Sequence, residues 1–385
     1  MIYHKTIFGQ LLNLFTRLEF QTIVKYYKGD YRARKLKCWD QFIYLLFAQL
    51  GYQASLRDTI DSMNSHQRKL YHFGAQRLCR STLSDANNKR DYRIYQDLFY
   101  SVLEKVQKIA PKYKLKLPRK LYIMDSTTID LCLKVLPWAR FRKTKAAIRI
   151  HTLMQADGSL PAFLRITDGK IHDNTAAKSL NIPPGSFLAI DRGYNDYKQY
   201  KYYTLNTIRF VTRLKRNATT KVIKTLYSDS DQVLSDQIVI FTGLKAASDY
   251  PFPIRKICYY DPGKKKKLVF LTNDLKLDAQ TIADIYKARW EIELFFKTIK
   301  QNLKIKRFLG TSRNAVCTQV WIAMIAYLLI SYQKFSQRTK YSIQKMFKLI
   351  QTNLFERKSL VDILTDKLFK PPEQKIYNQL ILFNF

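Results

Sequence analysis

Apolar positions in the first 110 residues recur with the spacing of helices. Leu11, Leu12 and Phe15 share one helical face, and residues 42–50 form a second apolar segment. The alternation of apolar and polar positions that marks a strand is not seen in this part of the sequence. We therefore predict an all-helical amino-terminal region over residues 1–110.

Serine residues mark two candidate helix starts in this region. Ser55, with Asp58 three positions later, fits a capping box, in which the serine hydroxyl accepts a backbone N–H that the first helical turn leaves unpaired. Ser81 or Ser84 is the candidate cap of a longer helix that runs toward Ile109.

After a basic linker at residues 111–120, the pattern changes to the short apolar runs of strands. Three consecutive strands are predicted first, the last two joined by a turn at Asp157-Gly158. The predicted strands cover residues 121–125, 148–155, 160–167, 187–190 and 208–214, and the predicted helices between them cover 174–180 and 194–205. An antiparallel meander followed by alternating helices and strands indicates a mixed sheet with helices on its faces.

A further β-rich segment interrupts this alternation. Residues 238–241, 254–260 and 268–272 are apolar or β-branched and predict strands, with four lysines at 264–267 forming a hairpin tip. The predicted organisation is a helical region at 1–110, a linker at 111–120, a mixed α/β core at 121–216 and 276–345, a β-rich insertion at 217–275, and a helical tail at 346–385.

Charge narrows the class of partner. The chain has 67 Lys and Arg against 30 Asp and Glu, a net charge of +37. Because the basic residues are spread along the whole chain, nucleic acid is a better partner than an acidic membrane surface. Residues 80–82 and 87–90 are candidate contacts of a helix-turn-helix-like reader. A helical bundle with solvated charges explains them equally well.

Other features exclude several classes of protein. The five cysteines are odd in number and far apart, which supports neither a disulfide framework nor a structural zinc site. No secretory signal is visible at the amino terminus, so we expect a cytoplasmic protein. Residues 315–332 are apolar enough to suggest a membrane span, but Thr318 and Gln319 interrupt them and basic segments flank them. We expect a buried helix there and no membrane partner.

One predicted helix, residues 286–300, carries a polar stripe. At about 100° per residue, its polar members fall within an arc of about 80°. The stripe consists of Tyr286, Arg289, Glu293, Lys297 and Lys300, and a core-facing side next to it consists of Ile285, Ala288, Ile292, Phe295, Phe296 and Ile299. A solvated face with an i,i+4 ion pair between Glu293 and Lys297 is the alternative explanation.

Two aspartates close predicted strands. Asp125 ends the strand at 121–125, and Asp191 directly follows the strand at 187–190. Carboxylates at strand ends meet over the sheet edge, and Glu293 on a helix packed there would complete an oxygen-only pocket of the kind Mg²⁺ or Mn²⁺ prefers. Two such ions activate a water or a sugar 3′-hydroxyl for phosphoryl transfer.

These residues carry a resemblance to DDE transposases. The spacing Tyr286-x2-Arg289-x3-Glu293-x6-Lys300 is similar to the Y-R-E-K signature of the fourth family of bacterial insertion-sequence transposases. Residues 124–128, 145–173 and 191–194 resemble the family's aspartate contexts and the stretch between them, and residues 55–58 and 80–87 resemble the amino-terminal domain often joined to it. The match extends from about Phe8 to about Tyr332.

The resemblance implies a fold and a set of site residues. The fold is a ribonuclease-H-like (retroviral integrase-like) mixed α/β core with a β-rich insertion, preceded by an all-α domain. The implied catalytic triad is Asp125, Asp191 and Glu293, which would bind two Mg²⁺ ions, with Mn²⁺ as a substitute. The implied DNA contacts are Tyr286, Arg289 and Lys300, and Lys297 on the same stripe is expected to act similarly.

The function expected from these features is DNA transposition. The protein would bind the terminal inverted repeats of a bacterial insertion sequence, pair two DNA ends as a homodimer, and cut and join double-stranded DNA. Three alternatives stay open at this point: a plain nuclease of the same fold, a non-catalytic DNA-binding protein derived from a transposase, and a membrane protein anchored by residues 315–332.

Overall fold

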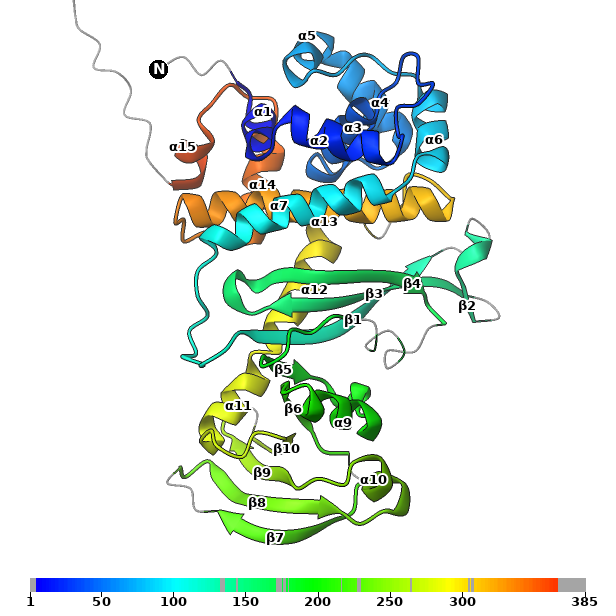
Figure 1. Cartoon of the computed structure of the whole chain (residues 1–385). Helices are drawn as coiled ribbons and strands as arrows, with labels where there is room; N and C mark the ends of the chain where they lie inside the picture. The colour runs from blue at the N-terminus through cyan, green and yellow to red at the C-terminus, as the bar shows by residue number, and fades with distance from the viewer. Residues whose placement is uncertain are drawn as a thin grey trace, which may run out of the picture.

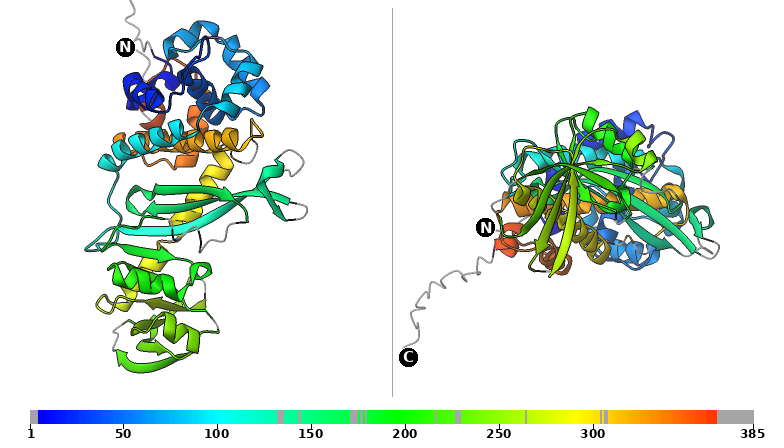
Figure 2. Two further views of the ribbon diagram at one scale, coloured as in Figure 1. Left: turned by 45° about the vertical axis from the view of Figure 1, so that its right-hand side comes forward. Right: turned by 90° about the horizontal axis from the view of Figure 1, so that it is seen from below.

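The computed structural model describes residues 5–365, apart from 132–135, 143–144, 171–174, 176–177, 179, 216, 227–229, 264, 304 and 306–307. Its elements stack as layers (Figure 1). A helical layer lies at one end, the long strands of a sheet come next, and the remaining strands reach the opposite end. A view turned by 45° shows the same order, and from below the strands fan out, as the natural twist of a sheet requires (Figure 2).

The helices of the described residues are α1 (Ile7–Leu11), α2 (Arg17–Tyr26), α3 (Cys38–Leu50), α4 (Leu56–Ser65), α5 (Gln67–Leu70), α6 (Arg80–Lys89), α7 (Arg93–Ile109), α9 (Tyr197–Leu205), α10 (Leu244–Asp249), α11 (Ala279–Lys287), α12 (Trp290–Asn302), α13 (Arg313–Ser336), α14 (Ile343–Asn353) and α15 (Leu360–Thr365). The strands are β1 (Leu121–Leu131), β2 (Arg140–Arg142), β3 (Lys145–Gln155), β4 (Leu160–Asp168), β5 (Phe187–Ile190), β6 (Arg209–Arg213), β7 (Thr220–Leu226), β8 (Val233–Phe241), β9 (Ile254–Asp261) and β10 (Lys266–Thr272).

The amino-terminal region is helical over the residues described, as predicted. Ser55 caps α4, because its hydroxyl accepts the backbone N–H of Asp58 at 3.1 Å. The predicted long helix ending at Ile109 is wrong, since α6 and α7 are separate helices and α6 begins without a side-chain cap.

A contact from a distant helix explains that break. The side-chain amide of Asn314, at the start of α13, donates to the carbonyl of Asn87 at 2.9 Å and accepts from the backbone N–H of Tyr92 at 3.2 Å. These backbone groups therefore bond across the protein instead of continuing one helix. Such a contact leaves no trace in the local sequence pattern.

The strands form one mixed sheet with the order β2-β3-β1-β5-β6-β10-β9-β8-β7, and β4 pairs with β3. β1 and β3 are antiparallel, as are β3 and β4, whereas β5 runs parallel to both β1 and β6. This confirms the predicted antiparallel meander and the mixed sheet of the α/β class. Because β10 pairs with β6, the β-rich insertion continues the same sheet.

The largest differences between the predicted and the observed strands are at β1, β2, β7 and β8, and β8 begins at Val233 where the prediction began at residue 238. β1 runs on to Leu131, so Asp125 lies inside the strand and not at its end. Polar residues after Asp125 hide this extension from the apolar pattern, but they pair with β3 up to the register Leu131↔Ala146. The short strand β2 and the exposed edge strand β7 were not predicted. The predicted helix at 174–180 lies largely outside the described residues.

Two apolar clusters cover the two faces of the sheet. On one face, Ile123 and Ile150 belong to a core shared with α7, α12 and α13. On the other face, Met124 and Leu153 pack in a cluster with the tyrosines of α9. The predicted buried helix at 315–332 is confirmed as α13, the one described helix long and apolar enough to cross a membrane, whose most apolar window is 94% buried inside the protein.

Candidate active site

Strand register brings the two predicted aspartates together. β1 and β5 are parallel, and Met124 lies opposite Ile190. The next residue on each chain is Asp125 and Asp191, so the two carboxylates leave neighbouring positions of the sheet. Asp125 shares the strand face of Ile123, the face covered by α12.

Asp191 is held where the chain leaves β5. Its Oδ2 accepts the backbone N–H of Gly193 at 3.2 Å and so caps the short turn that follows. Its Oδ1 accepts the Tyr286 hydroxyl at 3.4 Å and lies 3.4 Å from Nη2 of Arg213. One carboxylate oxygen therefore faces backbone, while the other faces the site.

The predicted single helix at 286–300 is wrong, because the chain forms two helices there. α11 ends at Lys287 and α12 begins at Trp290. The Arg289 N–H bonds to the carbonyl of Tyr286, three residues back, which is the tighter spacing of a 3₁₀ turn. The predicted apolar side of this segment is nevertheless buried, from Ile285 to Ile299.

Arg289 joins two of the acids. Its Nη1 lies 3.0 Å from Oδ2 of Asp125, and its Nη2 donates to Oε1 of Glu293. The Arg289 side chain is only 17% exposed and that of Asp125 21%. The three predicted acids thus come from β1, from the end of β5 and from α12, and they gather around one cluster of Arg289, Tyr286 and Arg213.

Tyr286 lies between the two guanidinium groups. The Cζ atoms of Arg213 and Arg289 lie 5.7 and 5.9 Å from the centre of its ring, within the range of cation–π attraction. The ring also packs on Phe270, with 5.0 Å between centroids. These contacts fix the hydroxyl that donates to Asp191.

The remaining stripe residues lie further along α12. Lys297 is exposed and Lys300 is half-buried, one and two helical turns beyond Glu293. Their side chains lie beyond the acids on the surface of the same helix. Their role as DNA contacts stays a prediction.

The electrostatics of the two aspartates differ. Burial, together with the nearby Asp191 and Glu293, raises the pKa of Asp125 from 3.8 to about 6, against the opposing effect of the Ser126 N–H and Arg289. Burial also acts to raise the pKa of Asp191, but the Gly193 N–H, Arg289 and Arg213 outweigh it and lower that pKa. Asp125 is therefore the carboxylate whose negative charge is compensated least.

These acids have the chemistry of a divalent-cation site. Their donors are carboxylate oxygens alone, which suit hard cations. Within the part of the chain that the structure describes, no three potential ligand side chains are close enough to hold a metal. The reason is visible in the geometry: the Arg289 guanidinium lies between Asp125 and Glu293. What the structure offers a metal is therefore the chemistry of the donor set, three carboxylates with oxygen donors alone.

Arg213 was missed in the sequence. It ends β6, and the register Ala189↔Val211 between β5 and β6 places it opposite Asp191 two residues further on. Its Nε is buried without a hydrogen-bond partner in the described structure. The available signal was a basic residue at the end of a predicted strand, but its neighbour in space depends on the strand pairing.

Two of the candidate reader residues are used inside the protein. Asn87 is buried and accepts from the amide of Gln41 at 2.8 Å. Arg90 donates to the Leu36 carbonyl and lies 3.7 Å from Asp30. That part of the helix-turn-helix-like hypothesis is wrong, whereas residues 80–82 are exposed.

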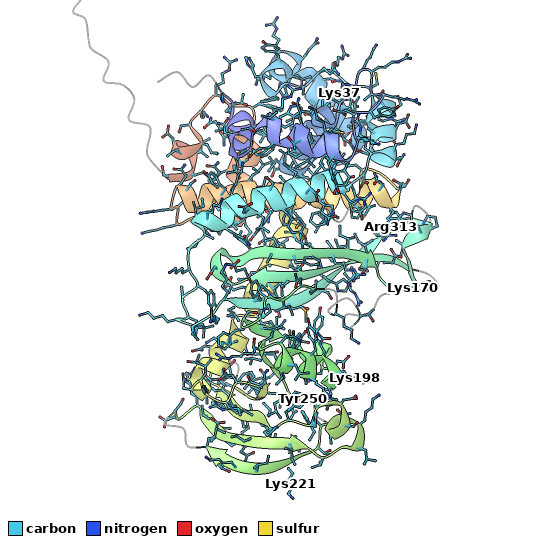
Figure 3. The ribbon with its side chains drawn as sticks, in the orientation of Figure 1. Lys37, Lys170, Lys198, Lys221, Tyr250 and Arg313 are labelled. Carbon is cyan, nitrogen blue, oxygen red and sulfur yellow. The ribbon has the colours of Figure 1, made fainter. Side chains whose placement is uncertain are left out.

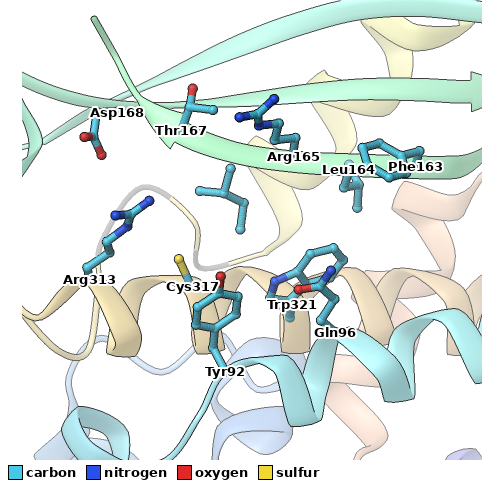
Figure 4. A pocket seen from close by; sticks show the side chains of 11 residues that line it. Tyr92, Gln96, Phe163, Leu164, Arg165, Thr167, Asp168, Arg313, Cys317 and Trp321 are labelled. Atoms are coloured by element: carbon cyan, nitrogen blue, oxygen red, sulfur yellow. The ribbon is translucent and has the colours of Figure 1, made fainter. Parts of the chain in front are cut away.

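A cavity of about 450 Å³ lies elsewhere, between β4 and the helices α7 and α13 (Figure 4). Leu164, Trp321 and Tyr92 line it, with Asp168 and Arg313 at one end. None of the three acids lines this cavity. The candidate chemistry therefore lies in the carboxylate cluster and not in this cavity.

Comparison with known proteins identifies the family of this chain. Residues 116–329 match the family described as transposase DDE domain, and residues 3–76 match a domain of unknown function (DUF4372). A putative transposase of Sinorhizobium fredii is 32% identical over 73% of this chain and 79% of its own length. A probable transposase for insertion sequence element IS5377 of Geobacillus stearothermophilus is 28% identical over 79% of this chain and 85% of its own length.

The chain belongs to the transposase DDE domain family, which confirms the predicted identification as an insertion-sequence DDE transposase. Among solved structures, the chain also aligns with one titled "Cryo-EM structure of piggyBac transposase synaptic complex with hairpin DNA", with a TM-score of 0.46 and 13% identity over 97% of this chain and 84% of that chain.

Proposed function

We propose that this transposase binds the terminal inverted repeats of its own insertion sequence and moves it by divalent-metal-dependent cleavage and strand transfer. The observation that carries the proposal is the meeting of Asp125, Asp191 and Glu293, from three separate elements, around Arg289 and Tyr286. The expected partners are the element's DNA ends and target DNA, with two copies of the chain pairing the ends in the bacterial cytoplasm.

We propose that the core is ribonuclease-H-like. The support is the antiparallel meander of β1, β3 and β4, followed by β5 and β6 in parallel to β1, with α9 between them. In this arrangement β1 and β5 are neighbours, and Asp125 and Asp191 therefore lie beside each other.

The three acids would hold two Mg²⁺ ions, or Mn²⁺ in their place. Bound there, such ions activate a water or a 3′-hydroxyl and stabilise the leaving oxygen of the phosphoryl transfer. The chain's own part is to hold the carboxylates in place: the Gly193 N–H orients Asp191 and the Ser126 N–H, at 2.8 Å, orients Asp125.

The basic residues would bind the DNA strand at the reacting phosphate. Arg289 is a fork of donors suited to phosphate oxygens, and its present partners are carboxylates, so an arriving phosphate offers it an equivalent acceptor. Tyr286, already aligned by two guanidinium groups, would bind the adjacent phosphate. Lys297 and Lys300 would continue the contact along α12.

The test uses DNA ends taken from the flanks of the gene and a supercoiled plasmid, with and without Mg²⁺ or Mn²⁺. Glu293→Gln removes one acid. Glu291→Gln is the matched control, because it makes the same change two residues away, at a side chain that accepts from the Ser159 hydroxyl at 3.0 Å. We expect metal-dependent joining that Glu293→Gln abolishes and Glu291→Gln keeps.

Other outcomes would overturn the proposal in distinct ways. Cutting without joining would identify a nuclease of the same fold, and binding with neither activity would identify a non-catalytic DNA-binding protein. Wild-type joining by a folded Glu293→Gln protein would show that the acid triad is wrongly assigned.

A further inference from the structure

The segment between α2 and α3 is strongly basic and aromatic. Residues 25–37 contain six basic residues, three tyrosines and one acid. We propose that this segment, here termed the α2–α3 loop, is a binding surface for duplex DNA. The proposal rests on the proposed function for the choice of partner, and it assigns a role to a part of the chain whose matching family model is described as a domain of unknown function.

Five of the six basic residues and two of the three tyrosines of the loop are exposed. Tyr26 is 79% and Tyr31 70% exposed, and the Arg32 guanidinium lies 5.1 Å from the centre of the Tyr31 ring. The exposed cations are Lys25, Lys28, Arg32, Arg34 and Lys35. Large aromatic side chains kept in water beside arginine are typical of binding surfaces, because they gain contact area only when a partner covers them.

The only acid of the loop points inward. Oδ1 of Asp30 accepts the backbone N–H of Cys38 at 2.7 Å, which anchors the loop to the start of α3. Arg90 lies 3.7 Å from the same oxygen. The Asp30 carboxylate, 30% exposed, is thus paired within the protein, and the fully exposed charges of the loop are all cationic.

The loop has a fixed backbone. Lys28 and Arg32 adopt left-handed conformations, with φ of 52° and 54°, and turns bond Tyr31 to Lys28 and Ala33 to Asp30. Gly29 packs so tightly that an added Cβ would lie 2.5 Å from Cδ1 of Ile94. Strained non-glycine residues persist only where the surrounding structure holds them. The backbone that carries the cations is therefore fixed, and little backbone conformational entropy is lost on binding.

Neighbouring elements extend this surface. Arg93, at the start of α7, is exposed and lies 5.4 Å from the centre of the Tyr27 ring, although its guanidinium is also ion-paired with Asp91 at 2.5 Å. Lys89, at the end of α6, is also exposed. Figure 3 shows Lys37, at the end of the loop, in the helical layer, far from Lys221 on β7 at the other end of the molecule.

The chemistry favours a nucleic acid backbone. Five exposed cations without an exposed acid between residues 25 and 35 match a row of phosphates, and the phenol rings can pack against sugars at the groove edge. Duplex DNA is the polyanion that the proposed function supplies.

The experiment measures binding of a labelled duplex carrying the element's end, by fluorescence anisotropy in EDTA, from 50 to 200 mM salt. One variant combines Lys28→Gln, Arg32→Gln and Lys35→Gln. Its control combines Lys221→Gln, Lys224→Gln and Lys245→Gln, three exposed cations of the insertion. Melting temperatures of all proteins are compared first, so that only folded variants are used.

Loss of three phosphate contacts lowers the slope of log K against log salt by about 2.7. The wild-type dissociation constant should therefore rise about 40-fold more than that of the loop variant between 50 and 200 mM salt. The insertion variant should keep the wild-type slope. Tyr26→Ala with Tyr31→Ala should weaken binding and leave the slope unchanged, because the rings carry no charge.

Each of the other possible results would refute one specific part of the proposal. Equal slopes for the loop variant and wild type, or equal losses in both triple variants, would refute the loop as a DNA surface while leaving the proposed function intact. Loop-dependent binding of a single strand or of anionic vesicles, without an effect on the duplex, would identify a different partner. If the wild-type protein does not bind the end at all, the proposed function itself fails.

Discussion

Replacing Asp125 with asparagine should stabilise the metal-free protein while abolishing its activity. Asparagine has nearly the same shape and keeps an oxygen for the Ser126 N–H, which Asp125 now accepts at 2.8 Å. The substitution removes the negative charge of the carboxylate, which the buried surroundings of Asp125 disfavour. In the wild type, burial raises the pKa of Asp125 from 3.8 to about 6.

The size and sign of the effect follow from proton linkage. Below about pH 4 the carboxyl is protonated in both the folded and the unfolded chain and has no effect on the free energy of unfolding. Between about pH 4 and 6 the unfolded chain ionises first, so wild-type stability falls as the pH rises. Above about pH 6 this loss of stability is complete. Because the pKa of Asp125 is about 2 higher in the folded chain than in the unfolded chain, the free energy of unfolding is then lower by about 3 kcal/mol.

The assay is thermal unfolding of wild type and Asp125→Asn in EDTA at intervals from pH 4 to pH 8. The variant should unfold a few degrees higher at pH 8, and the two proteins should converge near pH 4. Added Mn²⁺ should raise the wild-type melting temperature and narrow the gap. A difference that does not vary with pH, or a variant less stable than wild type at pH 8, would refute the reasoning.

Three further predictions concern neighbouring charges. Arg289→Ala should lower the free energy of unfolding by about 2 kcal/mol in EDTA at pH 8, because Asp125 and Glu293 lose the cation between them. Calorimetry of this variant without DNA should show tighter Mn²⁺ binding than in wild type. Arg213→Gln should slow metal-dependent cleavage about tenfold or more in a protein that is still folded, since Asp191 and Tyr286 lose a charged partner; an unchanged rate would exclude Arg213 from the site. Asp236→Ala should destabilise the protein by about 3–5 kcal/mol in denaturant unfolding, because it leaves the buried Arg255 guanidinium, now 2.6 Å from Asp236, without its counterion; a change below about 1 kcal/mol would contradict this account.

The apolar pattern was sufficient to predict the strands that are buried. β5 lies where the run at 187–190 predicts it, because all four of its residues are buried. β7 was missed because it is an edge strand exposed on both faces, so its sequence carries no inward and outward alternation. The extension of β1 beyond Asp125 was missed because its pairing with β3 holds a run of polar residues in strand conformation. The local apolar pattern thus predicts which strands are buried, whereas exposed or polar strands depend on their pairing with neighbouring strands.

The candidate active site could be predicted in part although the helix that carries it was not. The polar stripe was derived for one continuous helix, yet the chain breaks between α11 and α12. Tyr286 and Arg289 still meet, because side chains three residues apart eclipse one another in the 3₁₀ turn that joins the two helices. From Arg289 to Glu293 the spacing is four residues along α12, which keeps both on one face of an ordinary helix. A spacing of three residues from Tyr286 to Arg289 and four from Arg289 to Glu293 therefore brings these side chains together in one continuous helix and in two helices alike. For this reason the residues could be found from the sequence although the single predicted helix was wrong. Arg213 has no such spacing to either helix, and its place opposite Asp191 follows only from the register of β5 and β6.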